Sequence, residues 1–459
     1  MASSKLFAKF HITVKSVQNQ TKVLVNISPT HNRKYSTRSK IIVEKPIVEI
    51  GGDEMSKVIF DKVKKKLIIP FVNLERDYYD CSLKNRNRTE NEIVSGAIEA
   101  VKRYSAGVKC PTITPNEKMI KDYNLKQIIF PSPNVMIRSA LDGTQLREPI
   151  ICKGVSKFVP KWSRPIIMCR HTFGDQYGGK DIMLNEPGTV SLLYTTDSGQ
   201  FYKYDFDIRS KGVAMLTYNT EDSIKSFAES CFKVALERGY PLYFTSKFTH
   251  LKKYDQMFVN VFQELYNTKY KTLFEKAKLK YEHRLVDEMA AYAIKSTGGF
   301  VWALKSYDGD VLSDIIGQGF GSMGMMTNTF LSHDGKTVLT EPAHGTITRH
   351  YKRYQKGKAT STNPLSTIFA WTRCLRHRAQ LDSNYELLQF TNTIEKCTKE
   401  TVEEGHLTRD LALCTYGHNF QDNICISTDN IINIIADKLD VQFEKLFNEE
   451  EIEVKMTPP

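Results

Sequence analysis

The chain has 459 residues, of which 41% are apolar and 25% are charged. This composition is that of an ordinary soluble protein, and the length predicts two or three lobes around a large core. No uninterrupted apolar run approaches the roughly 20 residues needed to cross a bilayer. The nine cysteines include no C-x-x-C pair, so neither a zinc ribbon nor a redox dithiol is indicated.

The net charge of +12 is concentrated at the N-terminus. Residues 1–40 hold eight Lys or Arg and no acidic residue, which leaves 56 basic and 52 acidic residues, a net charge of +4, in the rest of the chain. Such a small charge argues against nucleic acid as a partner and is evidence for solubility and steering only.

The acid-free first 40 residues are predicted to be a transit peptide. They are rich in Lys, Ser, Thr and Asn, and Lys5, Lys9 and Lys15 interrupt the apolar residues between positions 6 and 14, so no secretory signal forms. Arg33-Lys34-Tyr35-Ser36 resembles a mitochondrial processing site with cleavage after Tyr35, which predicts the mitochondrial matrix. A plastid-type organelle and a simple disordered basic tail are the alternatives.

The next segment predicts an α/β protein. A branched apolar run from Ile41 to Ile50 ends in Gly51-Gly52, which indicates a buried strand entering a tight turn. Residues 56–69 then carry apolar side chains at helical spacing. A loop at residues 108–115 offers a lysine and two threonines beside prolines, groups suited to phosphate or carboxylate oxygens.

The densest set of anion-binding groups lies between Ser132 and Arg170. Arg138, Arg147 and Arg170 each present a planar fork that grips a carboxylate in a bidentate way. Three converging forks would indicate a substrate with several carboxylates, although surface arginines are common and spacing alone does not show convergence. Tyr177 is either a proton donor or a core ring.

Residues 175–220 alternate polar and apolar positions around turns and predict hairpins that pair with a partner. Long helices are expected over residues 221–238 and 254–278. Lys247 lies between them and is either a base or an ordinary exposed lysine. The segment 281–289 is expected to start another helix and to supply Asp287 as a possible metal ligand.

The segment from Ser306 to Gly324 contains Asp310 and Asp314, four residues apart. On a helix both carboxylates would lie on one face, where Mg²⁺ or Mn²⁺ suits such oxygen ligands. A tight turn at Asp308-Gly309 is expected before this helix. Gly319, Gly321 and Gly324 spell G-x-G-x-x-G, but no strand precedes them, so we interpret them as a close-packing or hinge segment and not as a Rossmann fingerprint.

Residues 341–350, Glu-Pro-Ala-His-Gly-Thr-Ile-Thr-Arg-His, form a glycine loop with hydroxyls, an arginine and two histidines. This set is well equipped to bind a phosphorylated nucleotide. The remainder, from residue 365 to about 447, is mostly helical by periodicity.

Several long motifs in order carry a resemblance to a known family. They are SPN with the following arginine, REPIICK, GDQY, YEHRL-D, YDGDVLSDIIGQGFGS, AHGTITRHY and STNP. Through them the chain resembles the eukaryotic-type homodimeric NADP-dependent isocitrate dehydrogenases of the β-decarboxylating dehydrogenase superfamily. The resemblance implies an α/β isocitrate/isopropylmalate dehydrogenase-like fold that is not Rossmann. It further implies a large domain (41–141 and 321–459), a small domain (142–174 and 221–320) and a strand-rich clasp (175–220) that joins two subunits.

The resemblance also implies the activity and the role of each site residue. The chain would oxidise and decarboxylate isocitrate to 2-oxoglutarate and CO₂ with NADP and Mg²⁺ or Mn²⁺. Tyr177 would be the general acid, and Lys247 from the neighbouring subunit the base. The metal would be bound by Asp310 and Asp314, with Asp287 from the neighbour. Isocitrate would be held by Thr114, Ser132, Asn134, Arg138, Arg147 and Arg170. NADP would be held by Lys109, Thr112, Lys295, His344, Gly345, Thr346, Ile347, Thr348, Arg349, His350 and Asn363, with Arg349 and His350 at the 2′-phosphate.

Five positions depart from the family pattern: Met119 for Arg, Tyr292 for Gln, an inserted Pro131, Cys169 for Gly and Asp142 for Gly. None removes a catalytic or metal-binding group, and the first two predict weaker cofactor binding. The runner-up reading is a related 2-hydroxy acid dehydrogenase that uses isopropylmalate or NAD. A non-catalytic relative that binds nucleotide or RNA is a third reading, which the retained Tyr177 and Lys247 disfavour.

Overall fold

The computed structural model describes residues 40–126 and 132–456, without the side chains of residues 419, 422 and 447–456. The predicted transit peptide, apart from its last residue, lies outside this range, and so does Pro131.

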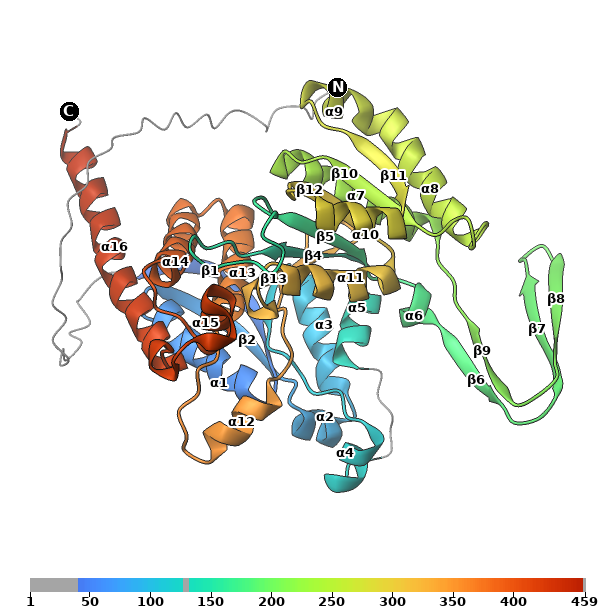
Figure 1. The fold of residues 1–459 in the computed structure, drawn as a ribbon, viewed down its shortest axis with the longest axis horizontal. Helices are drawn as coiled ribbons and strands as arrows, with labels where there is room; N and C mark the ends of the chain where they lie inside the picture. Colours follow the sequence, from blue (N-terminus) through green and yellow to red (C-terminus); the bar gives the residue numbers. More distant parts are fainter. Residues whose placement is uncertain (1–39, 127–131, 457–459) are drawn as a thin grey trace. The chain divides into compact units, whose positions relative to one another are not determined.

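One mixed sheet of ten strands runs through the described chain (Figure 1). Its strand order is β11-β10-β12-β5-β4-β13-β14-β3-β1-β2. The strands are β1 (Ile41–Gly51), β2 (Val72–Asp80), β3 (Ala106–Lys109), β4 (Gly143–Pro149), β5 (Ile166–His171), β10 (Leu242–Ser246), β11 (Tyr281–Leu285), β12 (Phe300–Leu304), β13 (Met326–Ser332) and β14 (Val338–Thr340).

The centre of this sheet is antiparallel and both flanks are parallel. β11, β10, β12 and β5 run parallel to one another, as do β14, β3, β1 and β2. Between these blocks, β4 pairs antiparallel with β5 and with β13, and β13 pairs antiparallel with β14. This topology differs from the all-parallel sheet of a doubly wound Rossmann domain.

Helices cover both flanks of the sheet (Figure 1). They are α1 (Glu54–Val63), α2 (Leu83–Thr89), α3 (Glu92–Tyr104), α4 (Glu117–Asp122), α5 (Pro133–Leu141), α6 (Asp175–Gly178), α7 (Glu221–Arg238), α8 (Tyr254–Leu265), α9 (Lys271–Lys276), α10 (Val286–Lys295), α11 (Ser306–Gly319), α12 (Thr348–Gln355), α13 (Leu365–Asp382), α14 (Tyr385–Glu403), α15 (Arg409–Tyr416) and α16 (Thr428–Met456).

Burial and helix capping explain why the sequence patterns predict these strands and helices correctly. Every residue of β5 and of β12 is buried, as expected for strands covered on both faces. Helix α7 begins after Thr220, whose hydroxyl accepts from the backbone N–H of Ser223, and it ends at Gly239 with a φ of 66°. Both ends are as predicted, because an N-cap threonine and a left-handed glycine are local signals.

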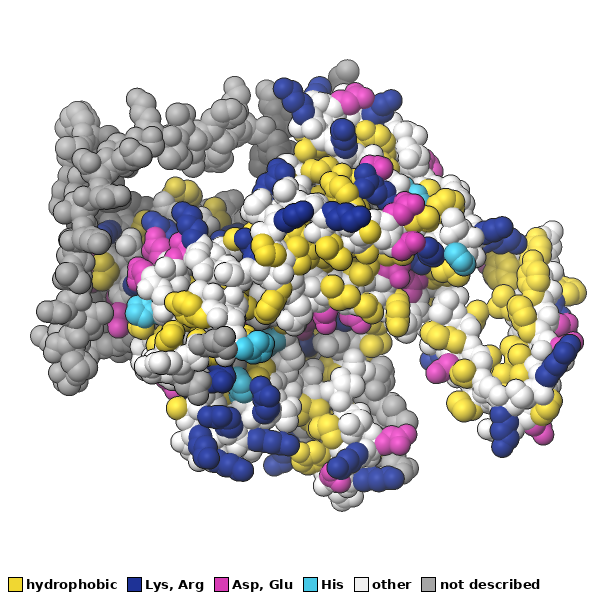
Figure 2. Space-filling view, in the orientation of Figure 1, with side chains coloured by type: hydrophobic (Ala, Val, Ile, Leu, Met, Phe, Trp, Pro, Cys, Tyr) yellow, Lys and Arg dark blue, Asp and Glu magenta, His cyan; other side chains and the backbone are white. Residues whose placement is uncertain are grey.

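The predicted strand-rich insertion is also confirmed. β6 (Lys180–Leu184) pairs with β9 (Gly212–Leu216), and β7 (Gly188–Thr195) pairs with β8 (Phe201–Ile208). Among the described strands, these four pair with one another alone and form an arm apart from the ten-stranded sheet. Large apolar side chains remain exposed along the arm, with Met183 at 73% and Phe201 at 68% (Figure 2).

Two local predictions are wrong. Asp308 and Gly309 do not form a turn, because α11 begins at Ser306 and includes both. Gly309 is required there since a Cβ atom would lie 2.7 Å from Cγ of Arg170. The segment from Tyr281 to Leu285 is strand β11 and not the start of a helix, which begins at Val286. Pairing with β10 decides its conformation, and sequence periodicity does not report pairing.

Within residues 40–126 and 132–456, no helix has the length and apolar character needed to cross a membrane.

The close-packing role predicted for the glycines after Asp314 can be tested at Gly319. A Cβ atom at this position would lie 2.2 Å from the ring of Trp162, which is fully buried. We expect Gly319→Ala to lower the free energy of unfolding by about 1–3 kcal/mol, because overpacked cores must shift. Gly188→Ala is the control, since a Cβ there meets nothing within 4 Å. Equal unfolding midpoints for the two variants in urea would contradict the packing argument.

Candidate functional site

The structure brings the predicted arginines together around Tyr177. Nη1 of Arg138, on α5, donates to the Tyr177 hydroxyl oxygen at 2.9 Å. Arg170, at the end of β5, donates to the same oxygen. A hydroxyl that accepts from two guanidinium groups must direct its own hydrogen away from both. The tyrosine therefore presents a donor to whatever occupies the space beside these arginines.

The two aspartates of α11 face the same group of cations. Arg170 forms an ion pair with Asp310, and Arg147 forms one with Asp314 and donates to the hydroxyl of Ser313 at 2.8 Å. The arginine side chains are almost fully buried, whereas the carboxylates are exposed at 55% and 60%. Burial lowers the pKa of Arg170 to about 10, so its guanidinium stays charged at neutral pH.

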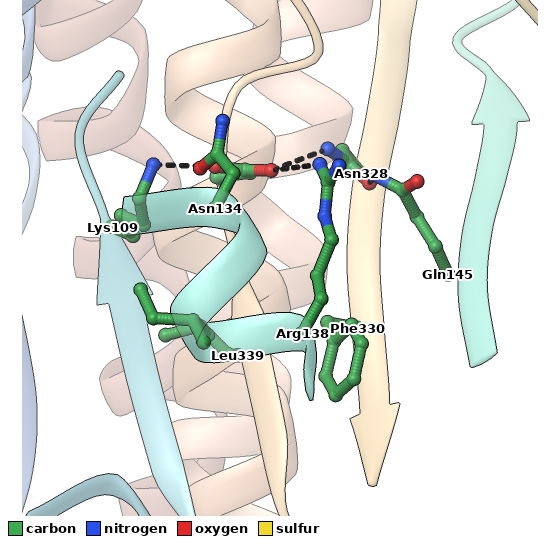
Figure 3. A pocket seen from close by; sticks show the side chains of 9 residues that line it. Lys109, Asn134, Arg138, Gln145, Asn328, Phe330 and Leu339 are labelled. Atoms are coloured by element: carbon green, nitrogen blue, oxygen red, sulfur yellow. Dashed lines mark hydrogen bonds and ion pairs between the residues drawn. The ribbon is translucent and has the colours of Figure 1, made fainter. Parts of the chain in front are cut away.

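The remaining predicted substrate residues lie on α5 and on the loop after β3. Ser132 is the N-cap of α5, and its hydroxyl accepts from the backbone N–H of Val135 at 3.2 Å. Asn134 lines a pocket together with Lys109, Arg138, Gln145, Asn328 and Glu341 (Figure 3). Thr114 is exposed, whereas the hydroxyl of Thr112 is buried and has no hydrogen-bond partner among the described residues.

The carboxylate of Glu341 accepts hydrogen bonds from three side chains of this pocket. Its carboxylate accepts from Nζ of Lys109 at 2.8 Å, from Nδ2 of Asn328 at 3.0 Å and from Nη2 of Arg138 at 3.4 Å (Figure 3). Burial alone would raise the pKa of Glu341, but the charges of Lys109 and Arg138 outweigh it and lower the pKa to about 2. The carboxylate is therefore ionised throughout the physiological range.

The predicted nucleotide loop is held against the first strand–helix turn. The hydroxyls of Thr346 and Thr348 both donate to Oε2 of Glu54 at 2.6 Å. The hydroxyl of Ser56 donates to the carbonyl oxygen of Gly345 at 2.7 Å. This leaves Ile347 in the left-handed region, with a φ of 58°. Contacts between segments about 290 residues apart thus shape the loop.

The last residues of the loop lie at the start of α12. Arg349 is exposed in its first turn, and a ring nitrogen of His350 lies 2.7 Å from the hydroxyl of Thr362. Burial lowers the pKa of His344, and its Nε2 atom has no partner among the described residues. Asn363 donates to Asp410 at 2.9 Å, and its side-chain oxygen accepts from the backbone N–H of Leu365, the first residue of α13.

Lys247 and Asp287 form a separate ion pair of 2.6 Å. The hydrogen bond from Lys247 lowers the pKa of Asp287. Lys295 is exposed at the end of α10. Across residues 40–126 and 132–456, no three His, Cys, Asp or Glu side chains gather in a metal-binding cluster. A single chain therefore does not bring Asp287 together with Asp310 and Asp314.

Asp310 and Asp314 nevertheless fit a hard divalent cation. They are two carboxylates one helical turn apart on α11, and both are more than half exposed. Each already forms an ion pair with a cationic side chain, Arg170 or Arg147. Oxygen donors of this kind are those that Mg²⁺ and Mn²⁺ prefer. The helix predicted for these two residues is confirmed.

Reasoning from the sequence missed three polar residues of the site. The sequence presents Glu341 only as part of a loop motif and predicts no role for Gln145 or Asn328. The sequence signal is weak, because Gln145 and Asn328 lie in strands that hold several other polar residues. Their meaning depends on the pairing of β4 with β13, which no local pattern predicts.

Comparison with known proteins places this chain in a family of dehydrogenases. A model of the isocitrate/isopropylmalate dehydrogenase family matches residues 42–434. The chloroplastic/mitochondrial isocitrate dehydrogenase [NADP] of Arabidopsis thaliana is 46% identical over 411 residues, covering 89% of this chain and 84% of that protein. The mitochondrial enzyme of Mus musculus is 48% identical over 393 residues, 85% of this chain and 86% of its own. The Nicotiana tabacum isocitrate dehydrogenase [NADP] is 46% identical over 413 residues, covering 89% and 99%.

The lowered pKa of Glu341 predicts a pH-dependent contribution to stability. A carboxylate whose pKa is lower in the folded than in the unfolded state stabilises the fold above its unfolded value, here 4.5, and this stabilisation is lost as the pH falls towards 2. We expect Glu341→Gln to unfold earlier than the wild type at pH 7. The difference should be constant down to about pH 5 and then shrink by up to about 3 kcal/mol.

Urea unfolding at a series of pH values measures this difference. Glu99→Gln is the control, because Glu99 forms an exposed pair with Lys102 and such pairs contribute less than about 1 kcal/mol. A stability difference for Glu341→Gln that stays the same from pH 7 to pH 3.5 would show that Glu341 titrates normally.

Proposed function

Since this chain belongs to the isocitrate/isopropylmalate dehydrogenase family, we propose that it converts isocitrate to 2-oxoglutarate and CO₂ with reduction of NADP and dependence on a divalent metal. Sequence identity of 46–48% to proteins named NADP isocitrate dehydrogenases supports the reaction. The observation that carries it is the convergence of Arg138 and Arg170 on Tyr177, next to the Arg147–Asp314 and Arg170–Asp310 pairs.

The three guanidinium groups suit a tricarboxylate. Each arginine offers a planar pair of donors to one carboxylate, and their burial removes competing water. Ser132 and Asn134, at the N-terminal end of α5, add a hydroxyl and an amide, and Thr114 adds a second hydroxyl. Together these groups would orient isocitrate with its hydroxyl-bearing carbon towards the cofactor pocket.

Two side chains would move the protons of the reaction. Lys247 of the partner subunit would take the proton of the substrate hydroxyl, and bound NADP would supply the hydride acceptor for this oxidation. Loss of CO₂ then leaves an enolate, and Tyr177 returns a proton to its carbon to give 2-oxoglutarate. The ion pair with Asp287 places the Lys247 side chain at the surface, where a second subunit can meet it. Lys247 would have to release Asp287 and lose its extra proton before the neutral amine could accept the hydroxyl proton.

Asp310 and Asp314, with Asp287 of the partner subunit, would hold the metal. A bound Mg²⁺ or Mn²⁺ ion supplies Lewis-acid stabilisation of the negative charge that develops on the substrate oxygen. The exposure of the two α11 carboxylates supports this assignment, because neither is sealed inside the core.

NADP would lie along the loop of residues 344–350, together with Lys109, Thr112, Lys295 and Asn363. The buried Thr112 hydroxyl and the Nε2 atom of His344, both without partners among the described residues, support a bound ligand here. Arg349 and His350 would contact the 2′-phosphate, the group that NAD lacks.

A homodimer would complete each site. The exposed apolar side chains of the arm support its role as a clasp between two copies. The separation of Asp287 from the α11 aspartates within one chain supports shared sites. The division into a large domain (41–141 and 321–459), a small domain (142–174 and 221–320) and a clasp (175–220) is part of this proposal.

The mitochondrial matrix is the proposed location. The first 40 residues lack acidic side chains, and the mouse relative is named mitochondrial. The name of the Arabidopsis relative adds the chloroplast as the alternative.

The reaction itself is tested by absorbance of the reduced cofactor. With isocitrate and Mn²⁺ we expect reduction of NADP, little reduction of NAD, and none after EDTA is added. Arg349→Ala should raise the KM for NADP by about tenfold to a hundredfold, the value of a lost charged hydrogen bond. Arg103→Ala, at the far end of α3, is the control. Preference for NAD, or no reduction of either cofactor by the folded protein, would contradict the proposal.

Shared active sites are tested by pairing inactive variants. Lys247→Met and Asp310→Asn should each be inactive as homodimers. A heterodimer purified with two affinity tags should recover about half of the wild-type activity, because one of its two symmetric sites is intact. The matched control pairs Lys247→Met with Asp287→Asn. Both changes then fall in the same half of the site, so no intact site forms. Recovery in neither pairing, or in both, would show that the sites are not shared in this way.

A further inference from the structure

Two buried side-chain amides lie between the substrate arginines and the cofactor lysine. Gln145 on β4 is 1% exposed and Asn328 on β13 is 4% exposed. Gln145 is paired with Phe330, two residues beyond Asn328, so the amides are diagonal neighbours on one face of the sheet and within reach of each other. Neither has a role in the reaction proposed above.

The hydrogen bonds of these amides form one directed chain. Nη1 of Arg170 donates to Oε1 of Gln145 at 3.2 Å, and Nε2 of Gln145 donates to Oδ1 of Asn328 at 2.8 Å. Nδ2 of Asn328 then donates to Oε1 of Glu341 at 3.0 Å. A guanidinium can only donate and a carboxylate can only accept, so the two ends determine which way each amide must face. Turning either amide over would set donor against donor or acceptor against acceptor.

Each end of this chain of hydrogen bonds contacts a different part of the site. Arg170 also contacts Asp310 and the Tyr177 hydroxyl. Glu341 also accepts from Lys109, at 2.8 Å (Figure 3). The hydrogen bonds therefore connect the guanidinium of Arg170, proposed to bind isocitrate, with the ammonium of Lys109, proposed to bind NADP.

Packing alone does not explain this choice of residues. Apolar side chains would fill the space between the strands without removing polar groups from water, which costs free energy unless every group is hydrogen-bonded. A fully satisfied buried network instead fixes side-chain orientation. Here it fixes the rotation of the Arg170 fork and of the Glu341 carboxylate at the same time.

We propose that Gln145 and Asn328 are positioning residues that couple isocitrate binding at Arg170 to cofactor binding at Lys109. This inference rests on the function proposed above. When a substrate carboxylate binds the Arg170 fork, the fork keeps its bond to Gln145 only in one rotation, and the amides hold Glu341 in the matching rotation. Lys109 then directs its remaining hydrogens towards the cofactor.

Binding linkage in a complex that does not react tests the proposal. NADPH with isocitrate and Mg²⁺ has no oxidant for the substrate, so NADPH fluorescence reports its Kd with and without isocitrate. In the wild type we expect isocitrate to change this Kd by at least about fivefold. Gln145→Met and Asn328→Leu should each reduce the change to less than about twofold. The double variant should resemble either single one, because residues that act as a unit are not additive.

Two further variants separate positioning from stability. Thr372→Val removes a part-buried 2.8 Å hydrogen bond from α13 to Glu395 on α14, which involves neither amide, and should keep the wild-type linkage. Gln145→Glu keeps the size and the contact with Arg170 but presents an acceptor to Oδ1 of Asn328. It should lose the linkage while its unfolding midpoint stays within a few degrees of the wild type.

The outcomes are distinct. Wild-type linkage in both Gln145→Met and Asn328→Leu, or additive effects in the double variant, would overturn the coupling. A wild type that binds both ligands without linkage would also overturn it, while leaving the proposed function intact. A wild type that binds neither ligand would overturn the proposed function as well.

Discussion

Charges buried at the centre of the sheet must be paired, and the arrangement of the site follows from this constraint. Lys109, Arg170 and Arg147 are 1%, 2% and 7% exposed, and an unpaired charge at such depth costs several kcal/mol. Their partners come from elements far away in sequence: Glu341 just after β14, and two aspartates on α11. Satisfying the cations therefore holds α11 against β4 and β5 and holds the nucleotide loop near β3.

The antiparallel strands β4 and β13 at the centre of the sheet allow the buried charges to be paired. Because β4 lies between β5 and β13, the register places Gln145 opposite Arg170, and Arg147 opposite Asn328. Side chains from β5, β4 and β13 thus reach the same face. An all-parallel sheet would gather its functional groups in loops at one edge, whereas here much of the site is built on the strands themselves, where side chains are held more rigidly.

The same ion pairs suggest how the site accepts its ligands. Arg170 pairs with Asp310, and Arg147 pairs with Asp314. In the proposed complex, substrate carboxylates would take the guanidinium groups and the divalent cation would take the aspartates. Each group then exchanges one opposite charge for another, so ligand binding leaves no buried charge unpaired. The exposure of the aspartates, in contrast to the burial of the arginines, fits such an exchange.

The sequence by itself determined the features that depend on near neighbours along the chain. These include the first strand and its Gly51-Gly52 turn, both ends of α7, the strands of the arm and the rejection of a Rossmann fingerprint at Gly319. Its motifs also named the chemical groups of the site. Only the tertiary structure decided that Gly309 lies inside a helix against Arg170, that Tyr281–Leu285 is a strand, and that Glu341 joins Lys109 to Arg138. Gln145 and Asn328 are 183 residues apart. Periodicity and capping signals report contacts within a few residues, whereas the pairing of β4 with β13 depends on how the whole sheet buries its apolar surface and its charges.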